Sequence, residues 1–167
     1  IQLPEVASKS TWKRNTFKKT IKMSQKQDSR HIRSYLTFRL GDEQYGIHVS
    51  QVLNILEMTR ITDVPQAPHY MKGVINLRGM VLPVIDTRSK FGMPETQHTS
   101  ETCIVVMDLD MADETMHLGA IVDSVLSVTE IGEDDIQPPP AIGNQYQSKF
   151  IYGMAKKEDG FVMLLDM

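Results

Sequence analysis

Residues 73–86 read GVINLRGMVLPVID, and this stretch decides the class of fold. Two apolar runs, Val74–Leu77 and Met80–Asp86, are rich in branched side chains and flank the pair Arg78-Gly79. Runs of this length, separated by two turn-forming residues, are typical of a β-hairpin. We therefore predict two strands here, with one charged residue at the tip of the turn.

The same pattern occurs further upstream. Residues 35–40 read YLTFRL, a turn follows at Gly41-Asp42-Glu43, and a second run covers Gln44–Val49. Alternating apolar residues on both sides of a glycine-containing turn predict a second hairpin.

A short helix is predicted after this second hairpin. Ser50 is a residue type that caps helix N-termini. Val52, Leu53, Ile55 and Leu56 then have spacings that would place an apolar stripe on one side of about two helical turns.

The first half of the chain ends in a polar link. A further apolar run, Ile61–Val64, is followed by a break at Pro65 and Pro68, and the region closes with Thr87–Phe91. Gly92–Ser100 contains few apolar residues and is the best internal boundary that the sequence offers.

The second half repeats the first. Shifting the chain by 73 residues places Tyr45–Glu57 on Leu118–Glu130, and shifting it by 80 places Gly73 on Gly153. Duplication of one small β lobe, with extra residues in one loop, explains both offsets.

The repeat predicts two lobes, at about residues 31–92 and 100–167. Each lobe has roughly five short strands, and closing such strands into a small barrel removes exposed sheet edges. Two barrels side by side leave a groove between them, where binding sites tend to form.

Composition indicates a globular protein. Of 167 residues, 41% are apolar and 23% are charged, a balance that allows a buried core. Runs such as Val81–Ile85 are too short to cross a bilayer, and no signal peptide is recognisable, so we expect a cytoplasmic protein without direct membrane insertion. The single cysteine, Cys103, cannot form an intramolecular disulfide.

Charge is divided unevenly along the chain. Residues 1–30 contain eight basic and two acidic side chains, which gives this segment a net charge of +6. Because the whole chain has a net charge of −3, the remaining residues carry −9. An acidic body does not attract nucleic acid. We interpret residues 1–22 as a leader that is not native to the domain, with Met23 as the natural start; a disordered tail is the alternative.

The sequence has no recognisable catalytic or metal-binding motif. Phosphate-cradling glycine loops and nucleophile elbows are missing, and the five histidines lack the spacing of metal ligands. We therefore expect no enzymatic activity, no cofactor and no metal.

The 73–86 stretch also carries a specific resemblance. Together with Tyr45-Gly46-Ile47, Ile61–Pro65 and Gly119–Asp123, it resembles the CheW family of chemotaxis coupling proteins, from about Tyr35 to Asp166. That resemblance implies two SH3-like five-stranded β-barrels and a non-catalytic scaffold in two-component signal transduction.

The resemblance also implies the partners. These are the regulatory domain of a CheA-type histidine kinase and the cytoplasmic tips of methyl-accepting chemotaxis receptors. A protein with these partners would be cytoplasmic and recruited to receptor arrays at the inner membrane. Proteins of this family tend to continue into a short helix after the last strand, so we expect the C-terminus at Met167 to be trimmed or incomplete.

Arg78 is the clearest binding residue that the resemblance implies, with Asn76 and Leu77 beside it in the motif. Its counterpart in the family lies in the region of receptor and kinase contacts; a solvent-exposed turn arginine is the alternative. Gly73 and Gly79 are expected to serve backbone geometry at tight turns.

Val52 and Ile55 resemble apolar positions that face a receptor helix in the groove. The family often has an acidic residue near the motif arginine, at the position of Asn54. Asn54 cannot form an ion pair with Arg78, and Glu57 is the candidate substitute.

Two other functions are compatible with the pattern. One is an isolated regulatory domain of a CheA-type kinase, which would come with phosphotransfer and kinase domains upstream. The other is a small-ligand or nucleotide-binding β protein, which requires convergent polar groups in the groove.

Overall fold

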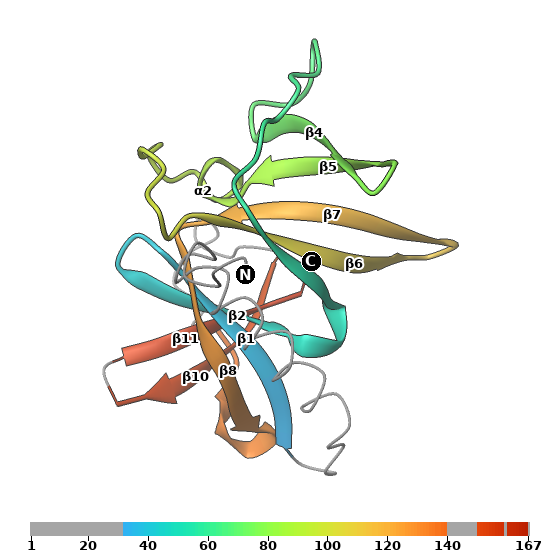
Figure 1. The fold of residues 1–167 in the computed structure, drawn as a ribbon. Coiled ribbons are helices and arrows are strands. Elements are labelled where there is room, and N and C mark those ends of the chain that lie inside the picture. The colour runs from blue at the N-terminus through green and yellow to red at the C-terminus, as the bar shows by residue number, and fades with distance from the viewer. Residues whose placement is uncertain (1–31, 140–149, 159, 167) are drawn as a thin grey trace, which may run out of the picture.

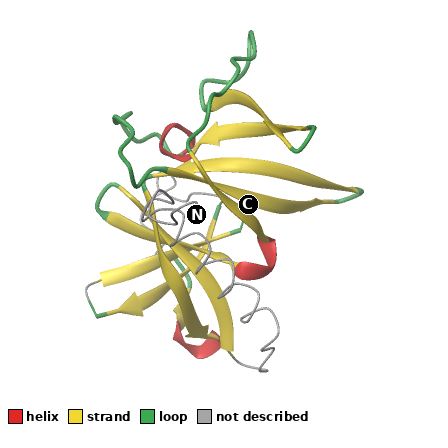
Figure 2. Ribbon diagram, viewed as in Figure 1, coloured by secondary structure: helices red, strands yellow, loops and turns green. Residues whose placement is uncertain are grey.

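The computed structural model describes residues 32–139, 150–158 and 160–166, and the fold is mainly β (Figure 1). The helical elements among these residues are single short turns (Figure 2). The predicted leader lies outside the described residues. In chain order the elements are β1 (Ile32–Leu40), β2 (Glu43–His48), η2 (Val49–Gln51), β3 (Val52–Glu57), β4 (Met71–Leu77), β5 (Met80–Asp86), α2 (Thr87–Lys90), β6 (Cys103–Met111), β7 (Glu114–Val122), β8 (Ser124–Gly132), η3 (Glu133–Asp135), β9 (Ile136–Gln137), β10 (Ile151–Lys157) and β11 (Gly160–Leu165).

The strands form two sheets. The first sheet has the order β8-β1-β2-β11-β10-β9, and the second has the order β3-β6-β7-β5-β4. The mainly β class with two sheets and few short helices is therefore confirmed.

The two sheets do not correspond to the two halves of the sequence. Residues 52–122 supply every strand of the second sheet, whereas the first sheet draws on residues 32–48 and 124–165. The sheets therefore do not follow the predicted lobe boundaries, 31–92 and 100–167. Parallel pairing of β2 with β11, and of β5 with β7, completes each sheet with strands from both halves.

The internal repeat appears in the strand register. In the parallel pairs, Gly46 lies opposite Leu164, and Gly119 lies opposite Val84. Gly46 and Gly119 differ by 73 positions and Val84 and Leu164 by 80, which are the two offsets found in the sequence. Equivalent strands therefore make equivalent pairings in both sheets.

Among the described residues, three apolar clusters form the core. The largest combines side chains from both sheets, such as Leu36 and Ile47 with Val105 and Val122, and so fills the space between them. Each sheet also has a smaller cluster of its own on the opposite face. Successive residues of a strand point to opposite faces, so β6 sends Ile104 to the small cluster of its sheet.

Both predicted hairpins are present. β1 and β2 pair from Tyr35 opposite His48 to Leu40 opposite Glu43, and β4 pairs with β5 up to Leu77 opposite Met80. Each turn is therefore two residues long.

The predicted helix after Ser50 is wrong. The chain makes one 3-10 turn, η2, and then continues as the strand β3, paired with β6. The register shifts between Val52 and Asn54, which makes Leu53 the extra residue of a β-bulge. The bulge turns Val52 and Ile55 toward the same face, and this produces the three-residue apolar spacing of a helix within a strand.

Among the described residues, no helix is both long and apolar enough to cross a membrane.

Candidate protein-binding surface

The turn between β4 and β5 presents Arg78 to solvent. Arg78 and Gly79 have φ values of 53° and 84°, both left-handed, as a type I′ hairpin turn requires. The amide N–H of Gly79 donates a hydrogen bond to Oδ1 of Asn76 at 2.8 Å, which braces the turn from inside. Within the described ranges, no carboxylate pairs with Arg78, so its guanidinium is available to another molecule.

Exposed apolar side chains follow Arg78 on β5. Val81 is 73% exposed and Met80 is 54% exposed, whereas Leu77 is half-buried against the small cluster of the second sheet. An exposed valine on a strand is ordinary, but two large apolar residues next to a free arginine favour a protein contact.

The neighbouring hairpin adds two methionines. Met111 and Met116, at the far end of β6 and β7, are also exposed. The β4–β5 and β6–β7 hairpins project in the same direction, toward the right of Figure 1. We call Arg78, Met80, Val81, Met111 and Met116 the hairpin surface.

Val81 and Met116 continue the inner face of the second sheet, whereas Met80 points to the opposite face. Met116 is two positions before Leu118 on β7, and Val81 is four positions before Ile85 on β5. Leu118 and Ile85 belong to the central cluster, and residues separated by an even number share a face. The same face thus packs on the first sheet at one end and is exposed at the other.

Val52 and Ile55 are not part of this surface. They are 3% and 2% exposed and lie in the central cluster between the sheets. Burial makes both of them core residues, so they cannot act as surface anchors in this conformation. Leu53, displaced outward by the bulge, is 48% exposed instead.

Asn54 does not approach Arg78 along the sheet. β3 and β4 are the two edge strands of the second sheet, with β6, β7 and β5 between them. Oδ1 of Asn54 accepts a hydrogen bond from the N–H of Ile55 at 2.9 Å, so the side chain serves its own strand. Glu57, the candidate substitute, lies on the same distant strand.

Gly73 and Gly79 favour glycine for different reasons. Gly73 has a φ of 144°, and a Cβ there would lie 2.0 Å from the carbonyl oxygen of Thr62. Gly79 faces open space, and only its φ of 84° favours glycine.

The first sheet has a charged hollow at the equivalent place. It has a volume of about 1140 Å³ and lies between the β1–β2 turn, η3 and the β10–β11 hairpin. Four carboxylates and two ammonium groups line it, with the half-exposed ring of Phe161 beside them. We call this site the charged hollow; its side chains are those of Asp42, Glu43, Gln44, Asp135, Lys156, Lys157, Glu158 and Phe161.

Sequence reasoning missed Met80, Val81 and Phe161. The signal was present, because Phe161 and Val81 are 80 positions apart, which is one of the two repeat offsets, and each is the second residue of its strand. The sequence pattern predicts these three residues to be buried within strands, because periodicity does not distinguish a buried strand end from one that projects into solvent.

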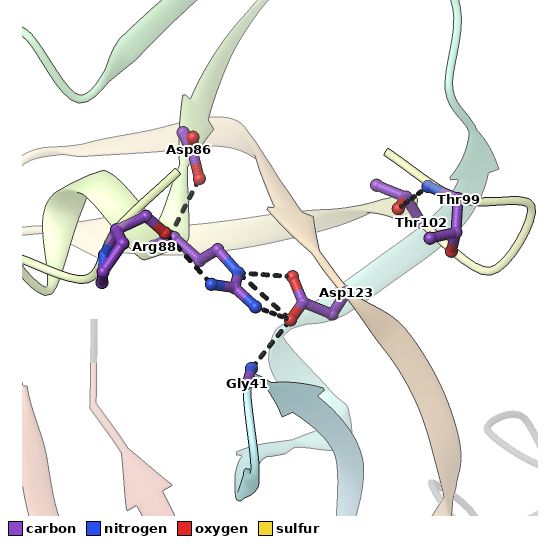
Figure 3. Close-up of polar contacts among 7 residues, drawn as sticks. Gly41, Asp86, Arg88, Thr99, Thr102 and Asp123 are labelled. Carbon is purple, nitrogen blue, oxygen red and sulfur yellow. Dashed lines mark hydrogen bonds and ion pairs between the residues drawn. The ribbon is translucent and has the colours of Figure 1, made fainter. Parts of the chain in front are cut away.

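An ion pair connects the two sheets (Figure 3). Nε and Nη2 of Arg88, in α2, donate to the carboxylate of Asp123 at distances of 2.6 to 3.1 Å. Oδ2 of Asp123 also accepts the N–H of Gly41, at the β1–β2 turn, at 2.7 Å. Burial raises the pKa of Asp123, but the hydrogen bonds from Arg88 and Gly41 outweigh it and hold that pKa below its ordinary value.

The part of the chain that the structure describes contains no cluster of three or more histidine, cysteine or acidic side chains able to hold a metal ion.

Comparison with known proteins agrees with this architecture. The profile of the CheW-like domain matches residues 34–167. Chemotaxis protein CheW of Rhizobium meliloti is 32% identical over 135 residues, covering 81% of this chain and 84% of that protein. Chemotaxis protein CheW of Helicobacter pylori is 32% identical over 143 residues, covering 85% and 83%.

The fold comparison gives the same result. The crystal structure of the scaffolding protein TtCheW from Thermoanaerobacter tengcongensis is similar with a TM-score of 0.71 and 30% identity, covering 81% of this chain and 89% of that one. The chain therefore belongs to the CheW family of chemotaxis scaffold proteins.

Proposed function

We propose that this protein acts without catalysis, by binding the regulatory domain of a CheA-type histidine kinase and the cytoplasmic tips of methyl-accepting chemotaxis receptors. The observation that carries the proposal is the hairpin surface, an exposed arginine beside exposed apolar side chains in a member of a scaffold family. A scaffold has no chemistry of its own, so it changes kinase activity only by holding the kinase in position relative to the receptor.

Binding energy and direction come from different parts of the hairpin surface. Burying a side chain such as Met80 or Val81 stabilises a complex by about 1.5 to 3 kcal/mol. Arg78 adds direction, because a guanidinium forms forked hydrogen bonds with a carboxylate or with backbone carbonyls. The type I′ turn holds Arg78 at a fixed position, which reduces the entropy lost on binding.

The charged hollow supports a protein partner rather than a nucleotide. A phosphate group would meet Asp42, Glu43, Asp135 and Glu158, whose charge is offset by two lysines among the described lining residues. In this proposal the protein is cytoplasmic and reaches the arrays at the inner membrane through its protein contacts alone.

Reconstitution with receptor-bearing membranes and kinase tests the proposal. We expect Arg78→Ala to reduce receptor-coupled autophosphorylation and Arg78→Lys to restore it only in part, because lysine lacks the planar fork. Val81→Ser should reduce binding of the isolated kinase regulatory domain or of the receptor. Arg60→Ala, which removes another exposed arginine next to the second sheet, is the matched control.

The readouts are the rate of ATP-dependent autophosphorylation and a separate pull-down with each partner. Full activation by both Arg78→Ala and Val81→Ser would remove the hairpin surface from the function. In that case the charged hollow would be the remaining candidate.

A further inference from the structure

α2 and the residue after it lie where the two sheets meet. The segment follows β5, the fourth strand across the second sheet, yet its side chains contact residues of the first sheet. We call residues 87–91 the clamp segment. Its contacts have a polar part and an aromatic part.

The polar part is centred on Asp123. This residue is the single link between β7, in the second sheet, and β8, in the first. Its carboxylate receives Arg88 from the clamp segment and the amide of Gly41 from the first sheet. The backbone N–H of Asp123 donates to the carbonyl of Arg39 at 3.1 Å, so the link is held on both sides.

Arg88 also fixes the loop that follows the clamp segment. Its Nη1 donates to the carbonyl of Pro94 at 3.0 Å. The side chains of Arg88 and Asp123 are 16% and 24% exposed, so solvent competes only weakly with their pairing. A forked arginine–carboxylate pair is directional as well as strong.

The aromatic part surrounds Lys90. Its Nζ lies 4.0 Å from the ring centroid of Tyr70 and 4.9 Å from that of Phe150. These two rings are repeat equivalents: the carbonyl of Tyr70 accepts the N–H of Asp86, and that of Phe150 accepts the N–H of Asp166, each at 2.8 Å. One cation therefore contacts matching aromatic residues that precede the β4–β5 and β10–β11 hairpins.

Phe91 completes the contact. Its ring lies 5.6 Å from that of Tyr45 and 6.1 Å from that of Phe150, both attached to the first sheet. The clamp segment therefore joins the second sheet to three separate places on the first: the β1–β2 turn, β2 and the start of β10.

We propose that the clamp segment fixes the angle between the two sheets, so that the hairpin surface and the charged hollow keep a constant separation. The inference rests on contacts within the chain and does not require the partners of the proposed function. Without the clamp segment, the central apolar cluster would still hold the sheets together, but apolar packing is less directional than a forked ion pair.

Distance measurement between spin labels tests this inference in the full chain. Labels at Lys156→Cys, in the first sheet, and Asp110→Cys, in the second, occupy exposed positions, whereas the native Cys103 is buried. The variants are Arg88→Gln and Lys90→Met, which keep most of each side chain and remove its charge. Arg33→Gln is the matched control, because its pair with Glu133, at 3.0 Å, lies within the first sheet alone.

We expect a single narrow distance in the parent and in Arg33→Gln, and a broader distribution in Arg88→Gln, broader still when Lys90→Met is added. Exchange of the Gly41 amide should rise on the order of tenfold in Asp123→Ala, which removes a hydrogen bond to a charged acceptor. Unchanged distance widths in both clamp variants, with folding intact by circular dichroism, would show that the apolar core alone sets the angle.

The measurement separates this inference from the proposed function. A broadened distribution supports the clamp even if neither receptor nor kinase binds. Loss of kinase activation by Arg88→Gln with an unchanged distribution would overturn the clamp and leave the coupling function standing.

Discussion

Gly46 and Gly119 occupy the same position in the two sheets, each beneath the side chains of its parallel neighbour. A Cβ on Gly46 would lie 3.1 Å from Leu164 and 3.2 Å from Val162; one on Gly119 would lie 3.3 Å from Val84 and 3.4 Å from Leu82. The repeat therefore extends from the order of strands to individual atomic contacts. Glycine at both positions lets the parallel strand approach closely.

Gly119→Ala should destabilise the protein more than Gly46→Ala. The new Cβ at 119 would also lie 2.8 Å from Cγ2 of Ile104, a stiff branched side chain in the core. We expect Gly119→Ala to lower the free energy of unfolding by about 1 to 3 kcal/mol, the usual cost of overpacking. Urea denaturation measures both variants, and equal losses would mean that Ile104 relaxes freely.

Ile55→Ala and Leu53→Ala should differ strongly although the residues are two positions apart. Ile55 is fully enclosed in the central cluster, and truncating such a residue costs about 2 to 5 kcal/mol. Leu53 is displaced to the surface by the bulge, and we expect a loss below about 1 kcal/mol. The midpoint of thermal or urea unfolding distinguishes them; a large loss at Leu53 would place the bulge elsewhere.

Arg78→Asn should separate function from folding. Arginine at a φ of 53° is strained, whereas asparagine tolerates the left-handed region, so we expect stability to be unchanged or to rise by up to about 1 kcal/mol. Kinase activation should nevertheless fall, because the guanidinium is gone. Unfolding curves and autophosphorylation of the same preparation check the two effects, and a variant that retains full activation would contradict the role of Arg78.

Acid should weaken the protein partly through Asp123. Its pKa is lowered in the folded state, so its contribution to stability is fully present above the ordinary aspartate value of 3.8 and is lost as pH falls through the lower, folded pKa. Asp123→Asn should therefore cost about 1 to 3 kcal/mol near neutral pH and flatten the acid limb of the stability curve. Urea unfolding between pH 7 and about 3 measures this.

The control for that experiment is Arg33→Gln, which removes an exposed ion pair of the first sheet. Exposed pairs contribute little, so its curve should follow that of the parent. An unchanged acid limb in Asp123→Asn would assign the acid sensitivity to other carboxylates.

Local patterns gave the hairpins correctly. The 14 residues around Arg78-Gly79 include the paired parts of both strands and the turn residues, so the hairpin can be predicted without knowledge of distant contacts. The repeat could also be detected, because glycines and strand ends at equivalent positions recur in the sequence itself. Burial of Val52 and Ile55 within a strand could not be predicted, because one bulge residue gives the apolar residues of that strand the three-residue spacing of a helix.

The arrangement of strands into sheets could not be read from the sequence. Pairing of β2 with β11 brings Gln44 next to Val162, and neither segment has a sequence pattern that identifies the other as its pairing partner. The clamp segment was missed for the same reason, since Arg88 and Asp123 look like ordinary surface residues until the fold places them together.

The strands of the second sheet lie in the sequence between those of the first sheet, and this arrangement also sets an order of assembly during synthesis. The second sheet is one continuous piece of chain, residues 52–122, and all its strands can pair as soon as that piece has emerged from the ribosome. The β1–β2 hairpin is made earlier but waits for β8 and β11, and until then both its edges expose unpaired backbone groups. We expect the nascent hairpin to depend on the finished second sheet as a template, so the protein is built from its middle outward.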